Sequence, residues 1–306
     1  MLRDFRPEVE LLVVSHNGEV DKCFEPCTVV KSFEAGLDLR PDAVIIASIS
    51  ALHGKELLAV LSLALPCLAE KPLVIHRDEL QALALAWEGA PVKPAWLVGC
   101  NLRYMPSLKK WRAQIADGVI GSVVRAQFEV GQDIALWRPS RNLKESYSAK
   151  AVDGGGVVCD LVHEIDMAVH TLGPLKILAA ASGRFGVSSI ESNDVSVSLM
   201  KTLRGVPVTI ALDYVSRQLV RRYSAVGTEG SLTWDLASRS LTLETLGQKK
   251  EIAVGMYAFD MAATYRAQML DWLGVIADRA HVVLSPVEEA LRSTATMLDI
   301  LEAGNA

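Results

Sequence analysis

The order of apolar patterns along the chain is the feature that most limits its fold. The first third carries continuous apolar runs, which are typical of parallel strands covered by helices on both faces. These runs lie at 9–15, 42–49, 67–69 and 96–100. Helical patterns at 50–65 and 77–88 separate the last three runs. A repeated strand–helix–strand order predicts a doubly wound α/β sheet.

The pattern changes after Gly121, where apolar and polar residues begin to alternate as in antiparallel strands with one solvated face. The expected strands are 123–131, 177–187, 194–203, 206–216, 219–227 and 230–235. The expected helices are 106–117, 156–172, 260–279 and 286–303. A chain of 306 residues has room for two such units. We therefore expect two domains, 1–120 and 121–306, the second an open antiparallel sheet with flanking helices.

Composition excludes several classes of partner. The net charge is -5 and no long Lys/Arg run occurs, so nucleic acid is not an expected partner. The most apolar segment lies between Glu56 and Glu70, where it is too short for a bilayer and interrupted by Pro66, so no membrane partner is expected. Five scattered cysteines predict reduced thiols and a cytoplasmic location. Cys23 and Cys27 lack a second ligand pair, so no metal site is expected.

The segment Glu70-Lys71-Pro72 is the first candidate for function. Lys71 follows a short buried strand, and doubly wound sheets bind ligands at the carboxyl ends of their strands. Pro72 favours an extended conformation at the lysine. A plain surface turn is the alternative interpretation.

The glycine run Gly154–Gly156 and the helix that follows it are the second candidate. Glycine lets the backbone approach a ligand or another domain closely. The expected helix places Asp160 and His163 three residues apart on one face, and a carboxylate beside an imidazole can transfer protons. Alternatively, His163 only fills a packing site. The next histidine is His170, so the metalloprotease zinc spacing is absent.

The third candidate is the polar, aromatic stretch around Trp137-Arg138-Pro139, which continues through Arg141 to Tyr147 and Ser148. It is too long for a tight connection, and loops of this kind often bind ligands. A surface loop or a subunit contact is the alternative.

Taken in order, these segments resemble the Gfo/Idh/MocA oxidoreductase family. The resemblance covers about residues 2–302. It is carried by the following matches: the string 41–48, His53, Glu70-Lys71-Pro72, the string 99–104, Gly154–Gly156 with Asp160 and His163, and the string 227–232.

The resemblance implies an incomplete Rossmann-type first domain followed by the open antiparallel sheet domain. It implies an NAD- or NADP-dependent dehydrogenase that transfers hydride between nicotinamide and a secondary hydroxyl of a sugar, sugar acid, sugar nucleotide or cyclitol. In the family the open sheet is commonly a subunit interface. We therefore expect a small-molecule substrate and a homodimer or homotetramer.

Residue roles also come from the resemblance. Lys71 is expected between nicotinamide and substrate, with Asp160 and His163 on the reacting hydroxyl. His163 would be the general acid/base, oriented by Asp160 or Asp166, and Lys71 would donate a hydrogen bond to the developing alkoxide. The expected cofactor contacts are Ser15, Asn17, Ser48, His53, Glu70, Lys71, Asn101, Trp137 and Arg138. The expected substrate contacts are Arg103, Tyr147, Asp160 and His163.

The chain departs from the family pattern in three ways. The spacing from Asp160 to His163 is three residues where the family usually has four. Ser15-His16-Asn17 contains neither the acid typical of NAD binding nor an arginine typical of NADP binding, so the choice of cofactor stays open.

The third departure is the glycine-rich loop. The family's first strand and its G-x-G-x-x-G loop are expected ahead of Leu2, and this motif does not occur in the 306 residues. Without that strand we expect a loosened first domain that binds dinucleotide poorly. The alternative function is a catalytically impaired metabolite-binding or regulatory protein.

Overall fold

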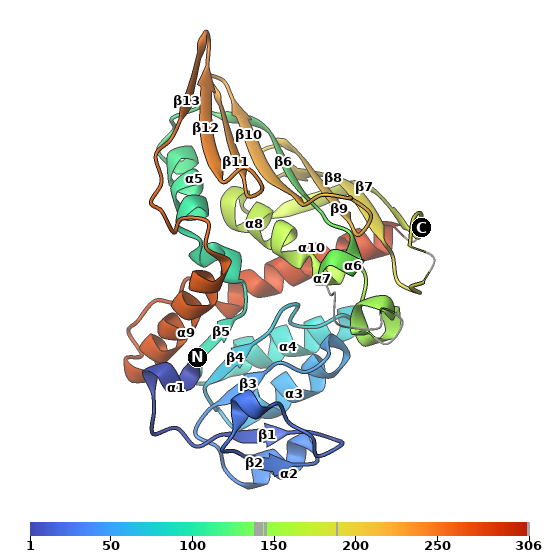
Figure 1. The fold of residues 1–306 in the computed structure, drawn as a ribbon, viewed down its shortest axis with the longest axis vertical. Coiled ribbons are helices and arrows are strands. Elements are labelled where there is room, and N and C mark those ends of the chain that lie inside the picture. The colour runs from blue at the N-terminus through green and yellow to red at the C-terminus, as the bar shows by residue number, and fades with distance from the viewer. Residues whose placement is uncertain (138–142, 144–145, 188, 305–306) are drawn as a thin grey trace.

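The computed structural model describes residues 1–137, 143, 146–187 and 189–304. Figure 1 shows two layers of structure joined by a long helix. The N-terminal third forms one end, a large sheet forms the other, and α10 (Val287–Gly304) lies between them. In the part that is described, no helix combines the length and apolar character needed to cross a membrane.

The core of the first domain is a parallel sheet, as the continuous apolar runs predict. Its order is β3-β4-β5, with α3 (Ser50–Ser62) and α4 (Arg77–Gly89) as the connections. The strands are β3 (Val44–Ile46), β4 (Cys67–Ala69) and β5 (Trp96–Val98). Every residue of β4 and β5 is buried, which is why these segments read as unbroken apolar runs.

A second, smaller parallel sheet pairs β1 (Leu12–Val14) with β2 (Thr28–Val30), next to α2 (Phe33–Asp38). In the doubly wound order 3-2-1-4-5-6, β2 and β1 occupy the first two positions and β3, β4 and β5 the last three. No strand among the described residues joins β1 to β3. Among the described residues β1 and β3 each have a partner strand on one side, and Val14 and Ile45 on these strands are 38% and 43% exposed.

The second domain is an eight-stranded sheet in the order β13-β12-β11-β10-β6-β9-β8-β7. Its strands are β6 (Val123–Gly131), β7 (Leu175–Gly183), β8 (Val195–Thr202), β9 (Pro207–Asp213), β10 (Val220–Gly227), β11 (Ser231–Asp235), β12 (Ser240–Thr245) and β13 (Gln248–Glu251). The sheet is mixed, where we expected it to be antiparallel throughout. β6 is inserted between the oppositely directed β9 and β10, so it must run parallel to one of them, which is β9.

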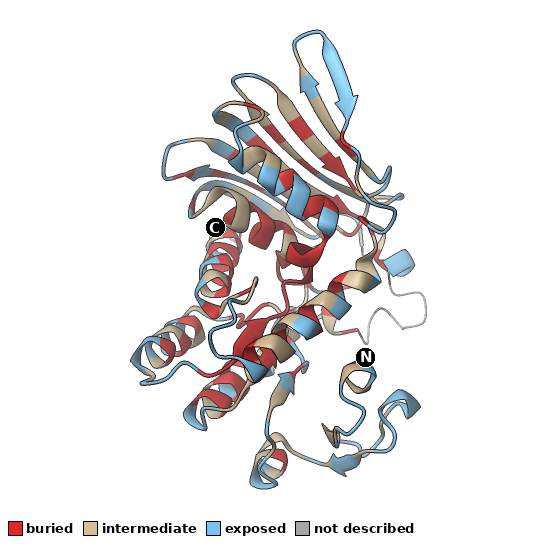
Figure 2. Cartoon of the chain, turned by 90° about the vertical axis from the view of Figure 1, so that its left-hand side faces the viewer, coloured by how far each residue is buried: buried red, intermediate tan, exposed pale blue. Residues whose placement is uncertain are grey.

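Helices cover one face of this sheet. α5 (Pro106–Ala116) packs on β11, α8 (Val162–Leu172) on β6, and α10 on β7. Figure 2 shows buried and less buried residues alternating along the strands, as expected for one covered and one open face. On β8 the open face carries Val197 and Leu199, which are 50% and 41% exposed.

The expected helix 156–172 is interrupted. α7 (Val157–Asp160) ends at Leu161, whose φ and ψ of -97° and 27° lie outside the helical range, and α8 begins at Val162. All residues from 157 to 162 are buried. A single straight helix buries one stripe of side chains, whereas the change of direction between α7 and α8 lets all the residues from 157 to 162 be buried.

The closing helix α9 (Met261–Ala277) returns to the first domain, where it packs on β5 and on η2 (Asn101–Tyr104). Met269 and Trp272 share a hydrophobic cluster with Leu68 and Leu97. The division of the chain at residue 120 remains a prediction.

Candidate active site

Polar residues gather at the carboxyl edge of the parallel strands. Ser15 and Asn17 follow β1, Ser48 follows β3, and Glu70 and Lys71 follow β4. This is the edge at which doubly wound sheets bind ligands.

The residues after β1 and β3 are fixed by local hydrogen bonds. The Ser15 hydroxyl donates to Oδ1 of Asn17 at 2.9 Å, and the exposed Asn17 side chain also caps the turn at Glu19. The exposed Ser48 donates to Oε2 of Glu56 at 2.6 Å. These side chains lie at the surface of the edge, where a ligand can reach them.

Two of the expected cofactor contacts are placed in the interior instead. His53 is buried, and its ring nitrogens lie 2.8 Å from the carbonyl of Pro72 and 3.2 Å from that of Ser48. It joins the segments after β3 and β4. Asn101 is also buried, and its Nδ2 donates to Oγ1 of Thr264 at 2.8 Å. In the structure both side chains therefore connect segments of the chain by hydrogen bonds.

Lys71 is half-buried at the end of β4. Its Nζ donates to the backbone oxygen of Asp160 at 2.8 Å, so the ammonium bridges β4 and α7. The carboxylate of neighbouring Glu70 lies against Gly99, where an added Cβ would approach Oε2 to 3.0 Å. A side chain at Gly99 would therefore press against the Glu70 carboxylate, which would have to shift by a few tenths of an ångström.

The Asp160 side chain is buried and accepts a hydrogen bond from the Tyr214 hydroxyl at 2.6 Å. Trp137 packs edge-on against the Tyr214 ring, with 6.0 Å between ring centroids. Tyr147 contributes to raising the pKa of Tyr214, after burial and the charge of Asp160. Three expected residues thus meet around Tyr214, while Arg138 lies outside the described residues.

His163 stands on the first turn of α8. Burial, and then the positive charges of Lys71 and Arg221, hold its pKa well below the ordinary value, so the imidazole is neutral at neutral pH. Its Nδ1 is buried and has no hydrogen-bond partner within the described part of the chain. The expected orientation of His163 by Asp166 is therefore not seen.

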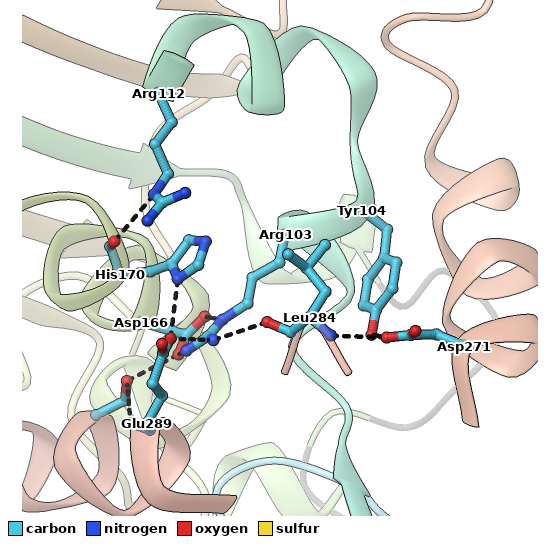
Figure 3. Close-up of polar contacts among 9 residues, drawn as sticks. Arg103, Tyr104, Arg112, Asp166, His170, Asp271, Leu284 and Glu289 are labelled. Atoms are coloured by element: carbon cyan, nitrogen blue, oxygen red, sulfur yellow. Dashed lines mark hydrogen bonds and ion pairs between the residues drawn. The ribbon is translucent and has the colours of Figure 1, made fainter. Parts of the chain in front are cut away.

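Asp166 instead forms a buried ion pair with Arg103, shown in Figure 3. Arg103 also contacts Glu289, which lies 2.9 Å from Nδ1 of His170. We expected Arg103 at the substrate, but the structure places its fully buried side chain at the junction of η2, α8 and α10. A guanidinium can be buried there because two carboxylates compensate its charge.

Two residues near the site were missed at the sequence level. Tyr214 lies within the expected strand 206–216, where the sequence pattern does not distinguish it as a site residue. Arg221 pairs with the buried Glu164, with Nε to Oε1 at 2.7 Å, and its charge acts on His163. Which of the adjacent Arg221 and Arg222 faces the helices depends on strand register, so no local signal distinguishes them.

Comparison with known proteins agrees with this architecture. Residues 108–233 match the GFO/IDH/MocA C-terminal domain. A levoglucosan dehydrogenase solved with NADH and levoglucosan superposes with a TM-score of 0.82 at 18% identity, over 97% of this chain and 88% of that one. A likeness at this identity concerns the fold, and it confirms the predicted combination of a Rossmann-type domain and a large sheet.

Two inositol dehydrogenases are similar in sequence. Inositol 2-dehydrogenase 2 of Mycolicibacterium vanbaalenii is 28% identical over 221 residues, which are 70% of this chain and 58% of the relative. Inositol 2-dehydrogenase of Mycolicibacterium smegmatis is 30% identical over 199 residues, or 61% of this chain and 51% of the relative. The chain thus spans about half the length of the curated relatives it matches. The match to the family model therefore concerns its C-terminal domain, and the similarity to the inositol dehydrogenases points to the same group of proteins.

Proposed function

We propose that this protein is a nicotinamide-dependent dehydrogenase that acts on a secondary hydroxyl of a cyclitol or sugar. The observation that carries the proposal is the contact of Lys71 Nζ with Asp160, beside a neutral His163. The Lys71 ammonium thus binds the backbone oxygen of Asp160 and lies close enough to His163 for its charge to lower the pKa of that imidazole. The similarity to inositol dehydrogenases and to levoglucosan dehydrogenase supports this class of substrate.

The chemistry follows from the charge states of these side chains. A secondary alcohol can lose hydride only if its hydroxyl proton also leaves. Neutral His163 can accept that proton, and the Lys71 ammonium can donate a hydrogen bond to the oxygen as negative charge develops. In the reverse direction, the protonated imidazole returns the proton to the alkoxide oxygen.

The strand edge fits the nicotinamide half of a dinucleotide. Ser48 and Ile49 are exposed after β3, and Gly99 keeps the edge beside Glu70 free of a further side chain. Bound dinucleotide would supply the hydride acceptor, and Ser15, Asn17, Ser48, Glu70 and Lys71 are the residues proposed to hold it. NAD is the first candidate, because the similar levoglucosan dehydrogenase was solved with NADH.

The test begins with binding. NADH and NADPH are titrated into the purified protein by nicotinamide fluorescence, and turnover is then assayed with myo-inositol, levoglucosan and a panel of sugars and sugar acids. Turnover that is lost in Lys71→Met, while the fold is retained, supports the proposal. Binding of dinucleotide or polyol without turnover indicates the regulatory alternative, and absence of both overturns the dehydrogenase proposal.

A further inference from the structure

Tyr214 is held rigidly at the end of β9. Its backbone N–H donates to the carbonyl of Asp194 at 2.8 Å, and its own carbonyl accepts from the N–H of Ile134 at 3.1 Å. The buried Asp194 carboxylate is itself fixed by three backbone N–H groups, those of Phe185, Gly186 and Val187. The backbone of Tyr214 is therefore held in place on both sides of the residue.

The hydroxyl of Tyr214 can act only as a donor to Asp160. The ring is fully buried and packs against Trp137. Burial, and then the charge of Asp160, keep the pKa of Tyr214 well above its ordinary value, so the phenol stays protonated. The bond of 2.6 Å from the hydroxyl to Oδ2 is short, as expected for a donor facing an ionised carboxylate.

Asp160 is thus held at two points. Lys71 binds its backbone oxygen, and Tyr214 binds its carboxylate. We propose that Tyr214 is a positioning residue, whose hydroxyl fixes the Asp160 carboxylate in the orientation in which it meets the substrate hydroxyl. This inference rests on the dehydrogenase function proposed above.

Tyr214→Phe tests the role by removing the hydroxyl while it keeps the ring and its contact with Trp137. We expect kcat to fall on the order of tenfold to a hundredfold, because one hydrogen bond to a charged group is lost. The Kd for NADH should stay within about twofold, since the cofactor contacts proposed above do not include Tyr214.

Tyr223→Phe is the matched control. Tyr223 is equally buried, and its hydroxyl donates to the buried Glu164 at 2.7 Å. A merely structural role for Tyr214 predicts that both variants lose melting temperature alike and keep kcat near the wild-type value. A selective loss of kcat in Tyr214→Phe supports positioning, and equal kcat in both variants overturns it.

A double-mutant cycle measured by thermal unfolding tests the contact between Tyr214 and Asp160 without a turnover assay. In the wild-type background Tyr214→Phe should lower Tm by about 2–4 °C. In an Asp160→Ala background the same change should cost nothing or raise Tm, because the phenol there has lost its carboxylate. Equal Tm losses in both backgrounds overturn the inference. If the wild type turns over no substrate, the dehydrogenase proposal fails, and this cycle still decides whether Tyr214 holds Asp160.

Discussion

Arg103 and Asp166 form a bidentate ion pair out of contact with solvent. Nε lies 2.8 Å from Oδ2 and Nη2 lies 2.6 Å from Oδ1. Ser293 on α10 donates a further hydrogen bond to Oδ1 at 2.7 Å. The pair, together with Ser293, therefore connects η2 with α8 and α10 through buried polar contacts.

Asp166→Asn should be severely destabilising. It keeps the shape of the side chain but leaves the Arg103 charge with Glu289 as its remaining carboxylate partner. Breaking a buried pair in this way costs about 3–5 kcal/mol of the free energy of unfolding. Urea unfolding measures the loss. Glu302→Gln is the control, because it breaks an exposed pair with Arg77 that is worth about 0–1 kcal/mol. Similar losses in the two variants would contradict a special role for the buried pair.

Glu289 should make the stability of the protein depend on pH in the acid range. The hydrogen bond from His170, followed by the charge of Arg103, lowers the pKa of Glu289 from 4.5 to about 2, against the opposing effect of burial. A folded-state pKa below the unfolded value stabilises the protein above pH 4.5, and this contribution is lost as the pH falls toward 2.

Glu289→Gln removes that contribution. The difference in unfolding free energy between wild type and variant should therefore be largest above pH 5 and shrink steadily on acidification. Chemical denaturation at several pH values between about 2 and 7 follows it. A difference that does not change with pH would show that the Glu289 contacts are not electrostatic.

Much of the fold could be predicted from the apolar pattern. The strands expected at 67–69 and 123–131 coincide with β4 and β6, because burial on both faces, or alternation over nine residues, leaves a clear signal. The strands β2, β12 and β13 were not predicted. β13 reads Gln-Lys-Lys-Glu and is exposed throughout, so it has no apolar pattern, and only its pairing with β12 makes it a strand.

The site could be predicted only in part. Lys71 and Asp160 are in contact, although they are 89 residues apart, and the family resemblance had placed both at the substrate. The hydrogen-bond partners of the buried carboxylates Asp160 and Asp166 could not be derived from the sequence. Arg103 reaches Asp166 and Tyr214 reaches Asp160 through packing of distant segments, and no local spacing encodes which carboxylate each one meets.

Lys71→Met should leave the fold intact and abolish most of the activity. Turnover is expected to fall on the order of a hundredfold or more, because the donor to the alkoxide is lost. The pKa of His163 should also rise, since one of the two positive charges that depress it is gone. It should remain below its ordinary value, because burial, the larger cause, is unchanged.

Histidine NMR titration tests this second effect independently of turnover. The chain has six histidines, and His163→Ala identifies the resonance. An unchanged His163 pKa in Lys71→Met would show that the Lys71 charge does not act on His163. Full activity of Lys71→Met would show that Lys71 takes no part in the mechanism.

The open face of the large sheet should bind a second copy of the chain. Leu178, Val197 and Leu199 expose apolar side chains on neighbouring strands β7 and β8, and apolar area of this kind usually marks an interface. Val197→Lys with Leu199→Glu should convert a dimer or tetramer to monomers in light scattering. Leu246→Lys, at the exposed tip of the β12–β13 hairpin, is the control. A monomeric wild type at micromolar concentration would contradict the proposed interface.

The two parallel sheets of the first domain should differ in local stability. β1 has one partner strand of three residues, and an isolated two-stranded sheet is marginal in water. β4 has a partner on each side and is fully buried. Backbone amides of β1 and β2 should therefore exchange with solvent about a hundredfold faster than those of β4. Hydrogen–deuterium exchange with peptide-level mass spectrometry resolves the two segments. Bound dinucleotide should slow exchange after β1, where Ser15 and Asn17 lie, and leave the α9 segment unchanged. Equally slow exchange in β1 and β4 would show that the smaller sheet is held by more than its single strand pair.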